Sequence, residues 1–143
     1  MYANRTTFFP KHSRGNGGTR KDLGLYVRSS WEANYARYLN FLVGTGDILE
    51  WKYEPKTFEF VGIKRGCRFY TPDFFIRWKN GKEEYHEVKG YMDQRSATKL
   101  KRMALYFPDV VVVLIDKKRY YGIAKSVSGL IPMWEKQVKK YVV

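Results

Sequence analysis

Two acidic residues and a lysine lie on neighbouring segments that both have the residue pattern of β-strands. Asp73 lies within the first segment, and Glu87-Val88-Lys89 ends the second. Side chains alternate along a strand, so Glu87 and Lys89 share one face and Val88 points away from it. Close carboxylates can hold a hard divalent cation, and a neighbouring lysine can orient a water molecule. The pattern therefore indicates metal-dependent hydrolysis, provided that Asp73 reaches the same face.

The turn between the two segments decides whether Asp73 does so. A two-residue turn would set Asp73 opposite Val88, on the wrong face. A three-residue loop over 79–81 sets Asp73 opposite Glu87 and gives Gly81 the left-handed conformation of a type I turn with a bulge. Directly opposed residues have β-carbons about 4.5–5.5 Å apart, so the two carboxylates would repel unless a cation lay between them. We therefore predict the three-residue loop or an equivalent bulge.

This register would create an oxygen-only site from Asp73, Glu87 and the backbone carbonyl of Val88, which suits Mg²⁺ or, alternatively, Mn²⁺. Lys89 would orient the attacking water and stabilise the developing charge. Each half of the motif also has a plainer interpretation. A Glu-x-Lys strand is often a surface ion pair worth about 0–1 kcal/mol, and Pro-Asp is a frequent turn element. Both halves on one hairpin of a strongly basic chain favour the metal site.

Four short motifs carry a resemblance to a known family. They are Arg28-Ser29-Ser30-Trp31-Glu32, Tyr53-Glu54-Pro55, Tyr70-Thr71-Pro72-Asp73-Phe74 and Glu87-Val88-Lys89-Gly90-Tyr91. Together they resemble the PD-(D/E)xK nuclease superfamily. Over residues 28–115 the chain is similar to phage enzymes of the endonuclease I type, which resolve Holliday junctions. The resemblance implies a restriction-endonuclease-like fold, DNA as substrate, and a homodimer that makes two symmetric cuts.

The resemblance also implies roles for individual residues. Asp73 and Glu87 would ligate the metal beside the Val88 carbonyl, and Lys89 would position the attacking water. Glu32 would be an additional acidic residue that touches a second metal or its water.

Two acidic residues of these motifs have structural interpretations as well. Ser29-x-x-Glu32 fits a capping box at the start of a helix, and a cap residue can still face the site. Glu54 is a weaker candidate for the site, because it precedes Pro55 at the end of an expected strand, where a glutamate is more often solvated.

The charge of the chain points to a polyanionic partner. Lys and Arg number 27 against 14 Asp and Glu, a formal net charge of +13, and each neutralised phosphate releases counterions. The candidate DNA contacts are Arg14, Arg20, Lys21, Arg28, Arg95, Lys99, Lys101 and Arg102. The first four lie in residues 1–28, which we interpret as a flexible basic arm or, alternatively, a frayed terminus. The last four lie on an expected helix, where the alternative is a solvated face.

Hydrophobic periodicity predicts one α/β domain over 29–143, with a mixed β-sheet flanked by helices in the order α-β-β-β-β-α-β-β-α. The resemblance implies that this sheet is of the restriction-endonuclease-like type. A helix should start at Ser29 or Ser30 and stop at Gly44 and Gly46. A second helix is expected over 93–107 and a closing helix over 132–141. The expected strands span 48–53, 57–61, 69–78, 83–89, 110–115 and, as an option, 120–124.

The remaining composition excludes some classes of protein. Cys67 is the only cysteine, so neither an internal disulfide nor a cysteine zinc cluster can form. The longest apolar run, 110–115, is too short to cross a bilayer, so we expect no membrane association and a cytoplasmic location, that of a host cell if a phage encodes the chain. The leading hypothesis is an endonuclease that acts on branched DNA. The alternatives are a nicking or sequence-specific endonuclease of linear duplex, and a non-catalytic DNA-binding module.

Overall fold

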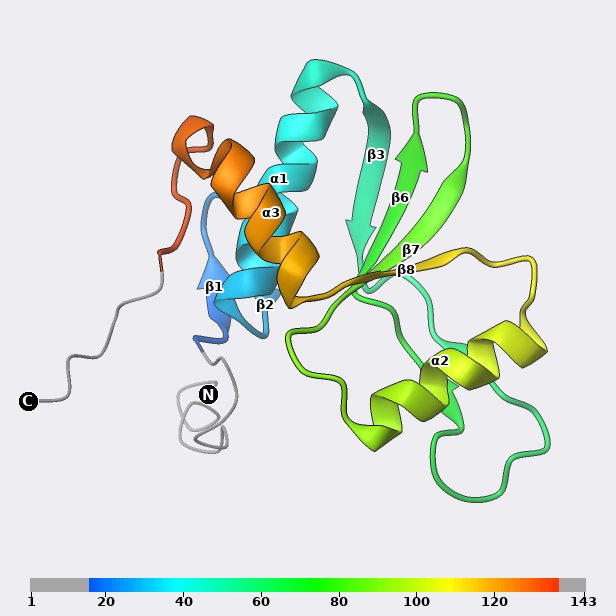
Figure 1. Cartoon of the computed structure of the whole chain (residues 1–143). Coiled ribbons are helices and arrows are strands. Elements are labelled where there is room, and N and C mark those ends of the chain that lie inside the picture. Colours follow the sequence, from blue (N-terminus) through cyan, green and yellow to red (C-terminus); the bar gives the residue numbers. More distant parts are fainter. Residues whose placement is uncertain (1–15, 137–143) are drawn as a thin grey trace, which may run out of the picture.

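A computed structural model of the chain describes residues 16–136, and its centre is a mixed four-stranded sheet (Figure 1). The strand order is β3-β6-β7-β8. The hairpin of β6 (Phe74–Trp78) and β7 (Glu83–Val88) is flanked by β3 (Ile48–Tyr53), antiparallel to β6, and by β8 (Val112–Ile115), parallel to β7. The predicted α/β fold with a mixed sheet and flanking helices is confirmed.

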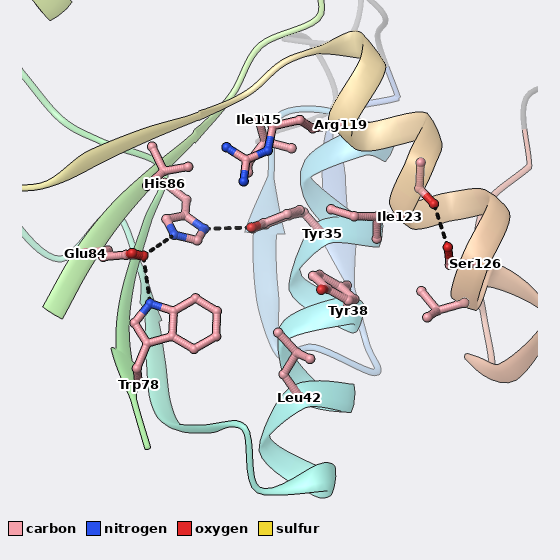
Figure 2. Close-up of a pocket in the computed structure, with 13 residues that line it drawn as sticks. Tyr35, Tyr38, Leu42, Trp78, Glu84, His86, Ile115, Arg119, Ile123 and Ser126 are labelled. Atoms are coloured by element: carbon pink, nitrogen blue, oxygen red, sulfur yellow. Dashed lines mark hydrogen bonds and ion pairs between the residues drawn. The ribbon is translucent and has the colours of Figure 1, made fainter. Parts of the chain in front are cut away.

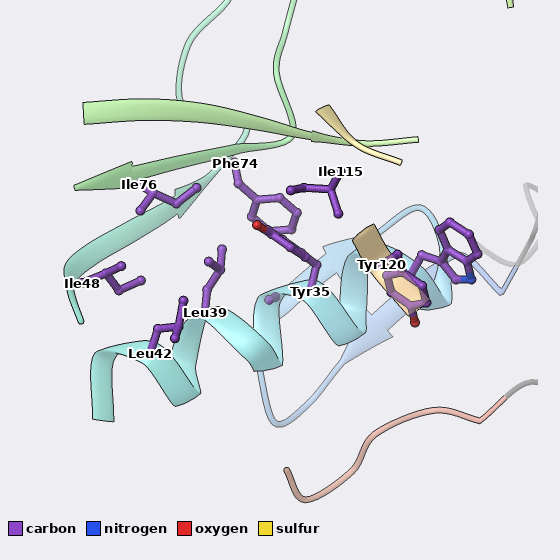
Figure 3. Close-up of a cluster of buried hydrophobic side chains, with 10 residues drawn as sticks. Tyr35, Leu39, Leu42, Ile48, Phe74, Ile76, Ile115 and Tyr120 are labelled. Carbon is purple, nitrogen blue, oxygen red and sulfur yellow. The ribbon is translucent and has the colours of Figure 1, made fainter. Parts of the chain in front are cut away.

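Helices cover both faces of this sheet because its side chains alternate between two apolar clusters. On one face Phe74, Ile76 and Ile115 pack against α1 (Ser30–Thr45) and Tyr120 of α3 (Lys117–Val127), as Figure 3 shows. On the other face Tyr85 and Val112 pack with Met103 of α2 (Gln94–Tyr106) and with Phe58 and Tyr70. These last two residues belong to a separate small sheet of β4 (Phe58–Glu59) and β5 (Phe69–Tyr70).

Helix α1 begins and ends as its sequence predicts. Ser29 is the N-cap and accepts a hydrogen bond from the Glu32 amide at 3.1 Å, which satisfies one of the helix's free N–H groups. Gly46 caps the other end with φ +84°, a left-handed conformation that glycine adopts without strain. Gly44 lies inside the helix and does not stop it.

The β6–β7 hairpin has the predicted three-residue loop. Gly81 has φ +87° and donates to the Trp78 carbonyl at 2.9 Å, and the Trp78 amide donates to the Lys82 carbonyl at 2.8 Å. The ladder then pairs Phe74 with His86. Continued by one residue, this register sets Asp73 opposite Glu87.

Two predicted strands differ from the structure. Residues 120–124 form part of α3 instead of a strand, because Asp116 caps a helix by accepting from the Arg119 amide at 2.9 Å. The expected strand over 69–78 is divided into β5 and β6 by 71–73.

The predicted closing helix over 132–141 is also wrong for 132–136, which contain no helix, while 137–141 lie outside the described residues. After the short 3₁₀ turn Ser128–Leu130, ring stacking and hydrogen bonds hold this part of the chain in place. Trp134 stacks on Tyr120, and the Glu135 amide donates to Asn34 Oδ1 at 2.8 Å.

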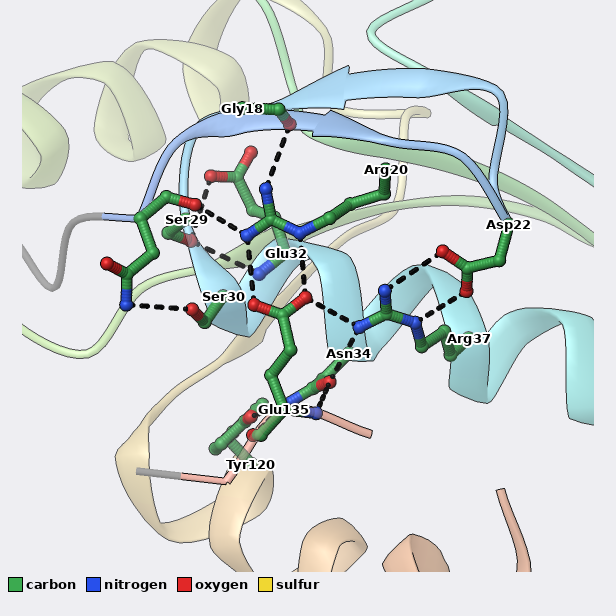
Figure 4. A network of polar contacts seen from close by, with 11 residues as sticks. Gly18, Arg20, Asp22, Ser29, Ser30, Glu32, Asn34, Arg37, Tyr120 and Glu135 are labelled. Atoms are coloured by element: carbon green, nitrogen blue, oxygen red, sulfur yellow. Dashed lines mark hydrogen bonds and ion pairs between the residues drawn. The ribbon is translucent and has the colours of Figure 1, made fainter. Parts of the chain in front are cut away.

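The expected arm over 1–28 is structured where the model describes it. Strands β1 (Gly18–Arg20) and β2 (Leu25–Val27) form a hairpin, whereas residues 1–15, with Arg14, lie outside the described residues. Figure 4 shows the ion pairs that connect this hairpin to α1 through Arg37 and Glu135. Glu135 Oε2 lies 2.7 Å from Arg20 Nε and 2.7 Å from Arg37 Nη1, and Arg37 also pairs with Asp22 at 2.8 Å. Both chain segments therefore meet at the first half of α1.

Candidate metal centre

Four elements bring acidic side chains together at one end of the sheet. Asp73 immediately precedes β6, Glu87 lies near the end of β7, Glu32 is in the first turn of α1, and Glu54 follows β3. Two backbone amides donate hydrogen bonds to Asp73. The Val88 amide donates to Asp73 Oδ2 at 2.8 Å, and the Glu54 amide donates to the Asp73 carbonyl at 2.8 Å.

Three of the carboxylates converge closely enough to share one cation. One oxygen each from Glu32, Glu54 and Asp73 lie within 4.8 Å of one another. Sequence reasoning ranked Glu54 as a weaker candidate and favoured a solvated position, so this residue was left out of the predicted ligands. The available signal was its place in the Tyr53-Glu54-Pro55 motif. Glu54 has φ +45°, a conformation that costs energy for a residue with a β-carbon, and such strained residues cluster at functional sites.

Glu87 extends the cluster beyond this group of three. Its Oε2 accepts a hydrogen bond from the Tyr70 hydroxyl at 2.8 Å. Its charge is, after burial, the largest contribution that raises the pKa of Asp73. The predicted pair of opposed carboxylates, Asp73 and Glu87, is thus present, with Tyr70 orienting one member.

The electrostatics of the cluster are those of negative charges held out of water. Burial raises the pKa of Asp73 well above its usual value, and the charges of Glu87 and Glu32 raise it further. Burial also raises the pKa of Glu87 and of Glu32. For Glu32 the hydrogen bonds from Tyr53 (2.8 Å) and Ser29 (3.1 Å) act in the opposite direction without cancelling the rise. The cluster therefore requires protons or a bound cation to offset its charge.

A hard divalent cation fits this donor set. All the side-chain donors are carboxylate oxygens, which Mg²⁺ and Mn²⁺ prefer. Glu54 Oε1 is buried and accepts no hydrogen bond of good geometry from any residue in 16–136, although Arg28 Nη2 forms an ion pair with it at 3.1 Å. A buried acceptor without a well-placed hydrogen bond is costly, and coordination to a cation would satisfy it.

Lys89 directly follows β7. Its amide donates to the Ile115 carbonyl at 3.0 Å, which fixes the backbone against β8. Its Nζ lies 3.9 Å from Asp93 Oδ2, at the start of α2, and its positive charge lowers the pKa of Glu87.

The candidate DNA contacts fall into two groups. The side chains of Lys21, Arg28, Arg95 and Lys101 are exposed, and that of Lys99 is half-buried near Asp93. Arg28 also pairs with Glu54, and two less exposed candidates have internal partners that sequence reasoning did not foresee. Arg20 pairs with Glu135, and Arg102 donates to the Cys67 carbonyl at 2.6 Å. These two arginines hold the fold together, and we do not assign them to DNA.

A separate cavity lies away from the carboxylates. It has a volume of about 560 Å³ and lies between α1, α3 and the sheet (Figure 2). Four of its polar side chains contact one another: the Tyr35 hydroxyl lies 2.6 Å from His86 Nδ1, and Trp78 Nε1 donates to Glu84 at 2.7 Å. His86 is thus a buried histidine whose ring nitrogens face Tyr35 and Glu84.

No protein-family model matches the chain, and no curated protein matches it. Within residues 16–136, none of the helices combines the length and the apolar character that crossing a membrane requires.

Proposed function

We propose that this chain is a metal-dependent endonuclease that hydrolyses DNA phosphodiesters. One observation carries the proposal: the β6–β7 register sets Asp73 opposite Glu87 at the point where Glu32 and Glu54 converge and Lys89 directly follows β7. The side chains are all of the types that metal-dependent phosphodiester hydrolysis uses. The formal charge of +13 supports a polyanionic substrate.

Each residue has a definite part in this proposal. Asp73 and Glu87 would hold Mg²⁺ or Mn²⁺ beside the Val88 carbonyl, and Glu32 and Glu54 would supply further oxygens for it or for a second ion. A bound divalent cation would stabilise negative charge on the phosphate and lower the pKa of a water molecule.

The surrounding groups would prepare the site for attack on the phosphate. The Lys89 ammonium would orient the attacking water and offset the charge that develops on the phosphate oxygens. Tyr70 and Tyr53 hold Glu87 and Glu32 by hydrogen bonds of 2.8 Å each, so these carboxylates are oriented before substrate binds.

The finer proposal is that the substrate is branched DNA such as a Holliday junction. It is supported by the resemblance of residues 28–115 to phage junction-resolving enzymes, and it includes a homodimer because two symmetric cuts need two sites. The alternatives are a nicking or sequence-specific endonuclease of linear duplex, and a DNA-binding module without catalysis.

The test is cleavage of a labelled four-way junction and of a linear duplex with the same arm sequence, in Mg²⁺, Mn²⁺ or EDTA. The wild type is compared with Asp73→Asn and with Asp109→Asn, a matched acid-to-amide control at an exposed position of the α2–β8 loop. We expect metal-dependent cutting by the wild type and by the control, and none by Asp73→Asn. Sedimentation of the protein with and without junction tests the homodimer.

The outcomes separate the hypotheses. Cutting of the junction alone supports the resolving enzyme, whereas equal cutting of both substrates keeps the nuclease and removes the junction preference. Tight binding of DNA without cleavage in either metal would overturn the enzyme proposal in favour of the binding module.

A further inference from the structure

Arg28 is a cation at the rim of the acidic cluster. It stands between Val27, whose side chain is fully buried, and Ser29, the N-cap of α1. Its backbone is therefore fixed, while 64% of its side chain is exposed. The side chain bends towards Glu54, with Nη2 3.1 Å from Oε1 and 3.2 Å from Oε2.

This ion pair uses only some of the hydrogen-bond donors of Arg28. A guanidinium group has five N–H donors in a planar fork that matches two oxygens of a carboxylate or phosphate. Only Nη2 contacts Glu54, and it donates a hydrogen bond to Oε2 alone. Within residues 16–136 the guanidinium of Arg28 makes no other hydrogen bond. Its other donors are free to meet a second anion.

The charges around Arg28 explain why the side chain rests there. Burial lowers the pKa of Arg28, but the charges of Glu54, Tyr53, Glu32 and Asp73 outweigh burial and leave the pKa raised. Without a metal, Arg28 is thus a counter-charge to the cluster on the Glu54 side, as Lys89 is on the Glu87 side. A divalent cation bound among Glu32, Glu54 and Asp73 would repel the guanidinium and compete for the oxygens of Glu54.

We propose that Arg28 exchanges partners, pairing with Glu54 in the metal-free protein and with a phosphate of the DNA once a divalent cation has bound the carboxylates. This inference rests on the proposed function and adds to it a role for Arg28. Arg28 keeps the cluster neutralised before the metal arrives and is released towards the substrate when it does. A phosphate presents paired oxygens to the same fork that Glu54 uses only in part.

The first test is a double-mutant cycle on DNA affinity in EDTA, where no cleavage occurs. The four proteins are the wild type, Arg28→Ala, Glu54→Gln and the double variant. Glu54→Gln removes the competing carboxylate, so it should tighten DNA binding about tenfold when Arg28 is present, the value of one charge-assisted hydrogen bond. In the Arg28→Ala background only the general loss of negative charge is left, and the gain should be about twofold.

A matched cycle uses Lys21→Ala in place of Arg28→Ala. Lys21 is exposed and makes no ion pair within the described residues, so its effect should add to that of Glu54→Gln without coupling. Additive effects in the Arg28 cycle, or the same coupling in the Lys21 cycle, would overturn the inference. Thermal unfolding of all variants identifies any that fail to fold, and Arg28→Lys supplies a conservative substitute.

The second test is metal binding without DNA, measured by titration calorimetry with Mn²⁺. Arg28→Ala should bind Mn²⁺ several-fold more tightly than the wild type, and Arg28→Lys should lie between them. An unchanged or weaker affinity would overturn the exchange. The two proposals fail differently: if the wild type binds no metal and cuts no DNA, the nuclease itself is wrong, whereas a wild type that does both with an uncoupled Arg28 contradicts the exchange alone.

Discussion

At the scale of single residues, the Asp73 carboxylate should favour metal binding but lower the stability of the metal-free protein. This carboxylate is buried beside Glu87 and Glu32, so the metal-free protein carries unfavourable charge at this point. We expect Asp73→Asn to raise the stability of the metal-free protein by about 1–2 kcal/mol, as is common when a functional site is neutralised. The asparagine oxygen can still accept the hydrogen bond from Val88. Urea unfolding in EDTA measures the change, and a destabilised variant would contradict it.

Lys89 should act on the reaction and leave the metal in place. Lys89→Ala removes the ammonium group but none of the four carboxylates, so Mn²⁺ affinity should persist while the cleavage rate falls on the order of 10²-fold or more. Single-turnover cleavage with saturating protein measures the chemical step. Lys101→Ala, an exposed lysine of α2, is the matched control and should keep the wild-type rate under these conditions. A Lys89→Ala variant with the same rate would exclude the assigned role.

Residue spacing predicted the part of the site that lies on one hairpin and failed for the part that does not. Asp73, Glu87 and Lys89 could be placed together because strand alternation and one loop length fix their faces. Glu54 joins them only because the end of β3 meets the start of β6, and that meeting depends on the packing of the whole sheet. The same holds for Arg20, whose partner Glu135 is distant in sequence.

At the scale of elements, the start of α1 links helix stability to the candidate metal centre. Ser29 Oγ accepts from the Glu32 amide and donates to Glu32 Oε2, both at 3.1 Å (Figure 4). Ser29→Ala should therefore cost about 1 kcal/mol of stability and weaken Mn²⁺ binding several-fold, because Glu32 loses one of its two hydrogen-bond donors.

Asp116→Ala provides the comparison for this prediction. It removes the N-cap of α3, so it should cost a similar free energy of unfolding and leave Mn²⁺ affinity unchanged. Equal loss of metal affinity in both variants would show that Ser29 acts through stability alone. Unfolding curves and calorimetric titrations on the same samples measure both quantities.

Elements with local signals were predicted well, and those shaped by tertiary contacts were not. The caps Ser29 and Gly46 and the Gly81 loop each have a local chemical cause that can be read from the chain. The aromatic run at 120–124 fits a strand by propensity, yet a cap at Asp116 and packing of Tyr120 on Trp31, with ring centroids 4.1 Å apart, make it helical. Propensity is a weak guide when burial decides the outcome.

At the scale of the whole molecule, stability should depend on pH in a direction set by the carboxylates. The pKa values of Glu32, Asp73 and Glu87 are raised by burial, so their contribution to stability is complete below their unfolded-state pKa of about 4 and is lost as the pH rises. Burial lowers the pKa of His86, so its contribution has the opposite sign and is lost as the pH falls below about 6.5.

Mg²⁺ should reverse the loss at high pH, because protons and the cation compete for the same oxygens. We expect the increase in Tm on adding Mg²⁺ to grow between pH 5 and pH 8, and to be much smaller for Asp73→Asn. Scans in EDTA and in Mg²⁺ at each pH measure it. A Tm increase that is constant with pH, or that is the same in Asp73→Asn, would show that Mg²⁺ binds elsewhere.

The two apolar clusters on opposite faces of the sheet have a consequence for hydrogen exchange. The cluster under α1 includes residues of β3, β6, β8 and α3, whereas α2 is held by the smaller cluster around Met103. Segments anchored by fewer buried side chains open at lower free energy. Amides of α2 should thus exchange faster than those of α1, and Mg²⁺ should slow exchange in β6 and β7 but not in α2. The helix that carries the proposed DNA contacts Lys99 and Arg95 would then be free to open and reclose while the proposed metal ligands stay in place.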